Sequence, residues 1–214
     1  MAEHRPLGLL AVWLHVAPEH EDEFNAWYNT EHIQQITGIP GFINGRRYMA
    51  LEGVPKYLAL YELHDETITA GREFQHVMAH PTPWSARMRG FYQDHRIRNT
   101  YRLIFTIGQA PATDAPYVYI VRMDIPAAME QNFNDWYNQE HLPGLAAVPG
   151  CFRARRFLAV DSQPKYMAVY EIEHPGVITS AAWAKARDTA WTEKIRPHMQ
   201  RRERRVYQLI RPAK

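Results

Sequence analysis

The sequence has few of the features that mark secreted, membrane-bound or nucleotide-binding proteins. Its 214 residues include one cysteine, Cys151, so no disulfide can form within the chain. No apolar run approaches the ~20 residues that a membrane-spanning helix needs. The amino-terminal residues also lack the apolar stretch of a signal peptide. We therefore expect a cytoplasmic protein with no membrane partner.

The charge balance and the glycine pattern exclude further classes. The formal net charge is +2, which gives no reason to expect a nucleic-acid partner. Neither phosphate-binding signature, Gly-x-Gly-x-x-Gly or Gly-x4-Gly-Lys-Ser/Thr, occurs, so a nucleotide cofactor is not expected. One basic run, residues 201–205, leaves two interpretations: a site for an anionic partner, or the solvated start of a final strand.

What the sequence does contain is one unit twice. Residues 24–32 recur 109 positions later as residues 133–141, with seven of the nine residues identical. A Pro-Gly turn, an Arg-Arg pair and a Pro-Lys-Tyr segment follow each copy in the same order. Two tandem units of roughly 100 residues each fit the ordinary size of a domain. We predict two domains, residues 1–110 and 111–214.

Hydrophobic patterning predicts the order βαββαβ in each copy. Apolar runs rich in β-forming residues predict strands, and a helical period with a proline at its start predicts each first helix. The first-copy elements are predicted at residues 8–16, 19–36, 41–51, 56–63, 68–91 and from 101 onward. This order is ferredoxin-like and of the α+β class. Its sheet leaves one apolar face bare, so two such sheets can cover each other.

The repeated unit resembles a known group of proteins. The motif Phe-Asn-x-Trp-Tyr-Asn-x-Glu-His on the first helix, then Pro-Gly and an Arg-Arg strand, is similar to the dimeric α/β-barrel superfamily, and within it to EthD-like bacterial proteins. The resemblance covers nearly the whole chain, twice. It implies tandem ferredoxin-like repeats that close as an intrachain pseudo-dimeric α/β barrel, with a pocket between the sheet and the helices of each half.

The resemblance implies less about chemistry. Members of the superfamily include cofactor-free monooxygenases, polyketide cyclases, lactone isomerases, haem enzymes and proteins with no established activity. A fold shared by such different proteins does not fix the reaction.

A carboxylate in each motif stands in an unusual position. On a helical wheel Glu31 falls on the apolar face with Trp27 and Tyr28, where an unpaired charge is costly. One interpretation is a desolvated acid or base for proton transfer. The other is a structural pair with Arg46 or Arg47. The corresponding residues of the second copy are Glu140, Arg155 and Arg156.

A histidine follows each of these carboxylates. The wheel places His32 on the flank of the apolar face, beside Asn25 and Asn29. Its ordinary pKa of about 6.5 suits proton transfer at neutral pH, and the asparagines could orient the ring or hold a substrate carbonyl. The alternative is a half-exposed histidine bonded to a backbone carbonyl. The second-copy counterparts include Asn138 and His141.

The two copies differ in their histidines. The first half holds eight of the 11: His4, His15, His20, His32, His64, His76, His80 and His95. On the first strand, Trp13 and His15 are replaced by Arg122 and Asp124 in the second copy. We therefore predict that the first half holds the reactive pocket. Two pockets for different parts of one ligand, and drift at surface positions, are the alternatives.

Two further sets of side chains could line that pocket. His76 and His80 are four residues apart on a predicted helix, a spacing that can supply two ligands to zinc or iron. No third ligand follows in a recognisable motif, so we expect no metal and favour one of the pair facing the pocket opposite His15. An aromatic wall would suit a flat apolar ligand or serve as core. Its candidates are Trp13, Tyr28, Tyr48 and Tyr61.

The sequence favours a cofactor-independent enzyme that uses acid/base chemistry on a small apolar or aromatic carbonyl compound. The reaction would be of the isomerase, cyclase, lyase or monooxygenase type, with His15 or His32 as the base. Glu31 or Arg46 would stabilise charge on an enolate oxygen. A non-catalytic binding or accessory protein is the alternative, and a haem or metal protein is a third reading. Whether the chain forms a homodimer stays open.

Overall fold

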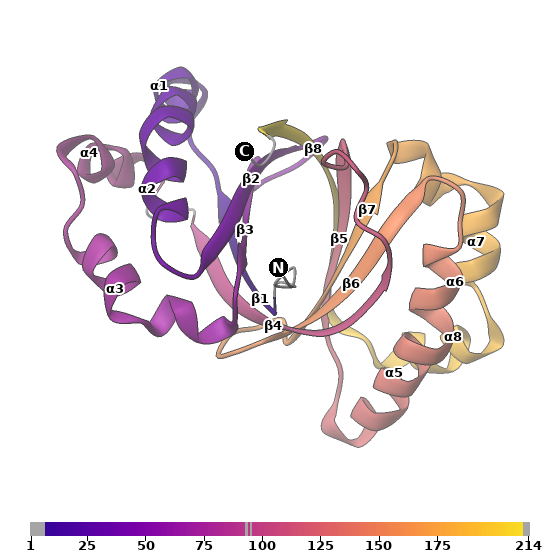
Figure 1. The fold of residues 1–214 in the computed structure, drawn as a ribbon. Helices are drawn as coiled ribbons and strands as arrows, with labels where there is room; N and C mark the ends of the chain where they lie inside the picture. The colour runs from indigo at the N-terminus through magenta and orange to yellow at the C-terminus, as the bar shows by residue number, and fades with distance from the viewer. Residues whose placement is uncertain (1–6, 93, 95, 212–214) are drawn as a thin grey trace. The chain divides into compact units, whose positions relative to one another are not determined.

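The computed structural model describes residues 7–92, 94 and 96–211. In these residues eight strands form a closed barrel in the order β1-β3-β2-β8-β5-β7-β6-β4. The strands are β1 (Gly8–Leu14), β2 (Phe42–Ala50), β3 (Tyr57–Leu63), β4 (Ile97–Gly108), β5 (Tyr117–Asp124), β6 (Cys151–Ala159), β7 (Tyr166–Ile172) and β8 (Gln200–Arg211) (Figure 1). The predicted α+β fold, two ferredoxin-like repeats in a pseudo-dimeric α/β barrel, is confirmed.

By its contacts the chain divides into two units. The first comprises Met1–Arg102 with Ile210–Lys214, and the second comprises Leu103–Leu209. Strand β4 begins in the first unit and continues past the boundary between Arg102 and Leu103 to Gly108. Each unit is described below by itself. Among the helices in the described ranges, none is long and apolar enough to cross a membrane.

The helices of the first unit follow the predicted order, with breaks that the predicted ranges 19–36 and 68–91 do not contain. The elements are a 3-10 turn (Pro18–His20), α1 (Glu21–Trp27), a π-helical turn (Tyr28–His32), α2 (Ile33–Thr37), a second 3-10 turn (Glu66–Ala70), α3 (Arg72–Ala79) and α4 (Pro83–Tyr92). The second predicted helix, residues 68–91, is interrupted between α3 and α4. Thr82 caps α4 by accepting a hydrogen bond from the Ser85 backbone N–H at 3.0 Å, and Pro83 occupies the first helical position, where its missing N–H costs nothing.

The second unit repeats this pattern. Its helical elements are a 3-10 turn (Ala127–Met129), α5 (Glu130–Trp136), a π-helical turn (Tyr137–His141), α6 (Leu142–Ala146), a 3-10 turn (Pro175–Thr179), α7 (Ala181–Arg187), α8 (Ala190–Ile195) and a last 3-10 turn (Arg196–His198). Thr189 caps α8 as Thr82 caps α4.

In the first unit the core lies between one face of the sheet and the helices. Alternate residues of β3 share that face: Tyr57, Ala59, Tyr61 and Leu63 all belong to the buried cluster. On the helical side the cluster includes Phe24, Trp27 and Tyr28 of the repeated motif. The same arrangement in the second unit uses Phe133, Trp136 and Tyr137. The repeated motif is therefore first of all the residue set that joins helix to sheet in each unit.

Candidate functional site

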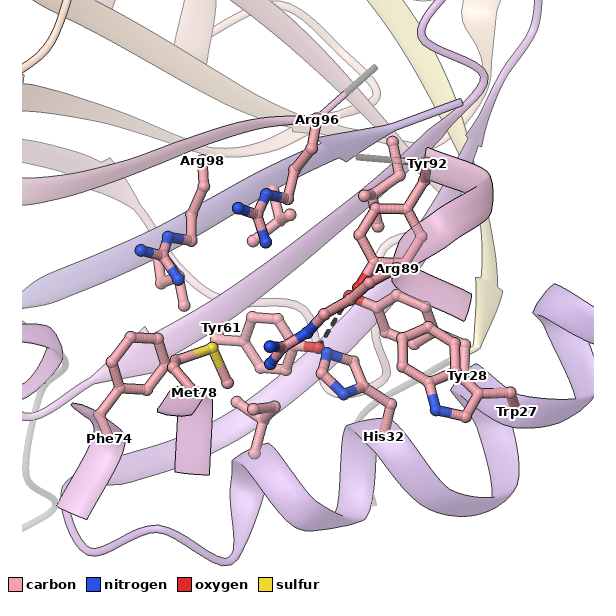
Figure 2. A pocket seen from close by; sticks show the side chains of 14 residues that line it. Trp27, Tyr28, His32, Tyr61, Phe74, Met78, Arg89, Tyr92, Arg96 and Arg98 are labelled. Atoms are coloured by element: carbon pink, nitrogen blue, oxygen red, sulfur yellow. Dashed lines mark hydrogen bonds between the residues drawn. The ribbon is translucent and has the colours of Figure 1, made fainter. Parts of the chain in front are cut away.

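Each unit contains a pocket between its sheet and its helices. The first pocket has a volume of about 450 Å³, counted with its open mouth. Its lining residues are Leu10, Val12, Leu14, Trp27, Tyr28, His32, Ile36, Tyr61, Phe74, Met78, Arg89, Tyr92, Arg96 and Arg98 (Figure 2). Most of the wall is apolar or aromatic, and four side chains, Tyr28, His32, Tyr61 and Arg89, form what we call its polar end.

Two buried tyrosine hydroxyls belong to the polar end. The oxygens of Tyr28 and Tyr61 are 2.9 Å apart. Burial raises the pKa of Tyr28 to about 12, and burial together with the neighbouring Tyr28 raises the pKa of Tyr61 well above its usual value. Both hydroxyls therefore stay protonated near neutral pH. The pair has two hydroxyl hydrogens and one bond between its oxygens, so one O–H is left to donate to a ligand.

His32 lies against the rings of Trp27 and Tyr28 as a neutral imidazole. Its ring stacks on Trp27, with 4.4 Å between centroids, and meets Tyr28 edge-on at 4.9 Å. Burial, and then the charges of Arg89 and Arg47, lower the pKa of His32 to about 3. Nδ1 is buried and has no hydrogen-bond partner among the described residues. The ring can exchange hydrogen bonds with a ligand, but its pKa is far from that of a general base at neutral pH.

The π-helical turn explains how His32 reaches this position. On an α-helix, residues five apart lie about 140° apart, and the wheel accordingly placed His32 on the flank, away from Trp27. Over Tyr28–His32 the chain forms a π-helical turn, in which hydrogen bonds join residues five apart. Trp27 and His32 then come to the same side and stack. The second unit repeats the turn, and Trp136 stacks on His141 at 4.2 Å.

Three arginines complete the lining of the first pocket, and none of them was among the site residues predicted from the sequence. Arg89 comes from α4, and Arg96 and Arg98 come from the segment that begins β4 (Figure 2). No aspartate or glutamate is among the lining residues, all of which lie in the described ranges. The signal that could have found them is the repeat, because Arg196 and Arg202 occupy corresponding positions in the second pocket.

The carboxylate of the motif is not paired with arginine, contrary to one of the two interpretations above. Thr82 Oγ1 and Ser85 Oγ donate to Glu31 Oε1 at 2.6 and 3.1 Å, and Trp27 Nε1 donates to Ser85 Oγ at 3.1 Å. Glu31 does not line the first pocket. It ties the start of α4 to the motif and fixes Trp27, on which His32 stacks. It is therefore a positioning residue for His32.

The second copy holds its carboxylate in nearly the same way. Thr189 Oγ1 donates to Glu140 Oε1 at 2.5 Å, and Trp136 Nε1 donates to Thr192 Oγ1 at 3.1 Å. Because both copies bond this glutamate to the residue that caps the next helix, the motif's Glu is explained by helix packing.

The asparagines of the motif bind the second arginine of the Arg-Arg pair. Arg47 is 1% exposed and donates to Asn29 Oδ1 at 2.7 Å and to Asn25 Oδ1 at 2.8 Å. Its guanidinium lies 4.2 Å from the ring centre of Tyr28, a cation–π distance. Arg156 repeats these contacts with Asn138, Asn134 and the ring of Tyr137. The asparagines therefore hold a buried cation behind Tyr28, and neither lines the first pocket.

Three predicted site residues lie on the other face of the sheet. Val12 lines the first pocket, so Trp13, its neighbour on β1, points away from it. Arg46 alternates with Arg47 in the same way and pairs with Glu62 at 3.2 Å. Tyr48 also alternates with Arg47 and is absent from the first pocket. The sequence analysis grouped these three residues with His32 in one site. Because side chains alternate between the two faces of a strand, they lie on the face opposite the first pocket.

The other predicted histidines do not line the first pocket either. His15 follows the end of β1 outside the lining set. His76 and His80 are exposed on α3, with ring centroids 4.2 Å apart. The inward face of α3 is taken by Phe74 and Met78, and His76, two residues from each, lies on the opposite side. His4 and His95, counted in the first-half excess, lie outside the described residues.

The second pocket has a matching aromatic end. Its volume is about 420 Å³ with its mouth, and its lining includes Tyr137, His141 and Tyr170 in the places of the first polar end. Burial and the charges of nearby arginines lower the pKa of His141 to about 3, and its Nδ1 also lacks a partner. Arg155 is buried against Glu171 at 2.8 Å and does not line the pocket. In the described ranges no three His, Cys, Asp or Glu side chains gather as a metal site would require.

Comparison with known proteins identifies the fold and no more. The chain matches no protein-family model and no curated protein. An anthrone oxidase-like protein is 16% identical, with a TM-score of 0.64 over 99% of this chain and 94% of that one. A mutant chlorite dismutase of Candidatus Nitrospira defluvii is 11% identical, with a TM-score of 0.63 over 95% and 91%.

A third similar structure is a ferredoxin fold protein of Listeria monocytogenes related to antibiotic biosynthesis monooxygenases. It is 10% identical, with a TM-score of 0.50 over 96% of each chain. At these identities the likeness shows a barrel of ferredoxin-like units and leaves the reaction undetermined. The likeness to EthD-like proteins in particular stays a prediction.

Proposed function

We propose that the protein is a cofactor-independent enzyme that acts on a small aromatic or apolar carbonyl compound through its enolate. The first pocket would hold the compound with its carbonyl oxygen at the polar end. The observation that carries the proposal is that three hydrogen-bonding groups line the same end of one pocket: an O–H of the Tyr28–Tyr61 pair, the neutral imidazole of His32 and the guanidinium of Arg89 (Figure 2).

Such a group of donors stabilises negative charge on oxygen. When a proton leaves the carbon beside a carbonyl, the charge passes to the oxygen, and fixed donors in a water-poor site stabilise it strongly. The charge of Arg89 already acts on the ring of His32, so it would act equally on an oxygen bound next to that ring. The apolar wall, which includes Phe74 and Met78, would hold the flat body of the compound.

His32 has a different role in this proposal from the one the sequence suggested. With a pKa of about 3, the imidazole is a weak base, so it serves as a neutral hydrogen-bonding partner of the enolate oxygen. Arginine cannot be deprotonated in proteins, and the pKa values of Tyr28, Tyr61 and Tyr92 are all raised by burial. The proton would therefore leave to water, and the site would act by making the bound compound more acidic.

The fate of the enolate sets the reaction type. Reprotonation at another carbon gives an isomerisation, and attack on a second carbonyl gives a cyclisation. Reaction with dioxygen gives an oxygenation, which the descriptions of two similar structures as oxidase-like and monooxygenase-related support. A cytoplasmic location and the absence of a nucleic-acid partner remain part of the proposal.

Hydrogen exchange tests the proposal without knowledge of the substrate. In D2O the wild-type protein should accelerate loss of the C1 hydrogens of 2-tetralone, followed by proton NMR. Arg89→Gln should lose most of the acceleration, while Arg102→Gln, an exposed β4 arginine outside the pocket, should keep it. Because the pKa of His32 is about 3, the rate should show no histidine inflection at pH 6–7. Binding of 2-tetralone without exchange would instead support the non-catalytic reading.

A further inference from the structure

We propose that the second pocket is a binding site of its own for a flat aromatic carboxylate, in which Arg202 binds the carboxylate and Asp124 positions Arg202. The site belongs to the second unit alone and does not depend on the reaction proposed for the first pocket. The two proposals therefore concern different pockets and can fail separately.

Three arginines line the second pocket, and one of them lacks a counter-ion. Arg187 and Arg196 both pair with Asp188, at 2.5 Å. No carboxylate of the described ranges lies within ion-pair distance of Arg202, and the lining includes no aspartate or glutamate. Burial and then the charge of Arg204 lower the pKa of Arg202, yet an arginine stays charged at neutral pH. A bound anion would therefore compensate this guanidinium.

Two uncharged polar groups lie near that guanidinium. After burial, the charge of Arg202 is the largest cause of the low pKa of His141. His141 is 8% exposed and lines the pocket, and its Nδ1 has no partner among the described residues. Burial raises the pKa of Tyr119 against the opposing charges of Arg204 and Arg202, so its hydroxyl stays protonated. Both His141 and Tyr119 can thus donate to an anion that Arg202 binds.

The apolar part of the second pocket suits a flat ring. Tyr119, Tyr170 and Trp183 all line it, and their ring centroids are 5.3 to 6.0 Å apart. Met123 and Met199 line it as well. Aromatic and thioether side chains pack well against an aromatic ligand. The lining therefore combines a surface for a ring with one guanidinium for an anion.

Arg202 belongs to the basic run of residues 201–205 and reaches the pocket at a β-bulge. Between positions 203 and 200 of β8 the register against β5 shifts by one residue, so Arg201 and Arg202 both lie opposite Met123. Residues that face each other across two strands share one face of the sheet, and both Met123 and Arg202 line the pocket. Arg201 has a φ of 46°, in the left-handed region that few residues other than glycine adopt.

Asp124 holds this bulge in place. Its Oδ2 accepts from Arg201 Nε at 2.5 Å, and its Oδ1 accepts from the backbone N–H of Lys165 at 2.6 Å. An unusual backbone conformation persists where its surroundings over-determine it. Because Arg202 follows Arg201 directly, the Asp124–Arg201 pair fixes the backbone from which the Arg202 side chain extends. Asp124, which replaces His15 in the second copy, is therefore a positioning residue for Arg202.

Comparing 2-naphthoate with 2-naphthamide isolates the contribution of the carboxylate. A guanidinium binds a carboxylate through charge-assisted, often bidentate, hydrogen bonds, which are about twice as strong as neutral ones. The amide has nearly the same shape, so it keeps the apolar contacts and loses the ionic ones.

Methyl NMR of the full chain, labelled at its methionines, reports each pocket separately. Met123 and Met199 line the second pocket, whereas Met78 lines the first. A bound naphthalene ring should shift the Met123 and Met199 signals, and their titration gives the affinity of the second pocket. We expect 2-naphthoate to bind there roughly tenfold more tightly than 2-naphthamide. Met123 and Met199 signals that do not move with 2-naphthoate, or equal affinities for the two compounds, would overturn the proposal.

Variants assign the preference to Arg202 and to the pair that positions it. Arg202→Gln should abolish the preference for 2-naphthoate, and Arg102→Gln, an exposed arginine of β4, should preserve it. Arg201→Gln, on the surface, and Asp124→Asn should each reduce the preference several-fold and leave the affinity for 2-naphthamide unchanged. A preference that survives Arg202→Gln would contradict the site. Equal losses for both compounds in Arg201→Gln would contradict the positioning role of Asp124.

Discussion

Acidifying the protein from about pH 6.5 to about pH 4.5 is expected to lower the free energy of unfolding by roughly 4 kcal/mol through two histidines alone. Burial holds the pKa of His32 and of His141 at about 3, against an ordinary value of 6.5. Each ring therefore takes up its proton on unfolding, so acid favours the unfolded chain. The loss starts near pH 6.5 and grows as the pH falls toward 3.

Urea unfolding at a series of pH values measures this effect. The double variant His32→Gln with His141→Gln should lack the steep part of the dependence, and each single variant should lose about half of it. Because each substitution also changes the absolute stability, the slope with pH is the quantity to compare. If the double variant kept the wild-type slope, the two imidazoles would not be the buried neutral groups described here.

Substitution of the two motif histidines is expected to have unequal effects on catalysis. His32→Gln should lower the rate of 2-tetralone exchange by about 10²–10³, the usual cost of removing one donor from an oxyanion site. His141→Gln should change the rate by less than about twofold, because Asp188 pairs with Arg187 and Arg196, two of the three arginines that line the second pocket.

The comparison is well matched, because the two rings make the same aromatic contacts. Each stacks on a tryptophan and meets a tyrosine edge-on. A structural effect of losing the imidazole should therefore be similar in both variants, and only a chemical role should separate them. Equal losses would show that the two pockets react alike, and a larger loss for His141→Gln would assign the reaction to the second unit.

The repeat and the strand pattern predicted the fold well. Two copies of the order βαββαβ were visible in the sequence, and alternate residues of the predicted strand 56–63, namely Tyr57, Ala59, Tyr61 and Leu63, lie together in the core cluster. These patterns depend on residues close together in the sequence and occur in both copies. Tertiary contacts therefore had little effect on the secondary structure that the patterns indicate.

The site was predicted less well, for three physical reasons. A helical wheel assumes an unbroken α-helix, and the π-helical turn moved His32 from the flank onto Trp27. The wheel also could not show that Glu31 would accept from two hydroxyls, one from the residue before α4 and one within it, 51 and 54 residues away.

The third reason concerns the arginines of the first pocket. Arg89, Arg96 and Arg98 stand in no motif and come together only when α4 and the start of β4 close over the sheet. Comparing the copies would have drawn attention to them, because arginines recur at corresponding places in the second pocket. The excess of histidines in the first half was more conspicuous, yet of its described histidines only His32 lines the pocket.

The central claim, that the polar end of the first pocket stabilises an oxyanion, is tested most directly by the pKa of a bound phenol. Titration of 4-nitrophenol, whose ionised form absorbs visible light, can be followed in the presence of saturating protein. An apolar pocket alone would raise the pKa of the phenol by desolvation, whereas the tyrosine O–H, His32 and Arg89 should lower it by about one unit or more. Arg89→Gln should reverse the shift. A pKa that rises on binding to the wild-type protein would contradict the claim.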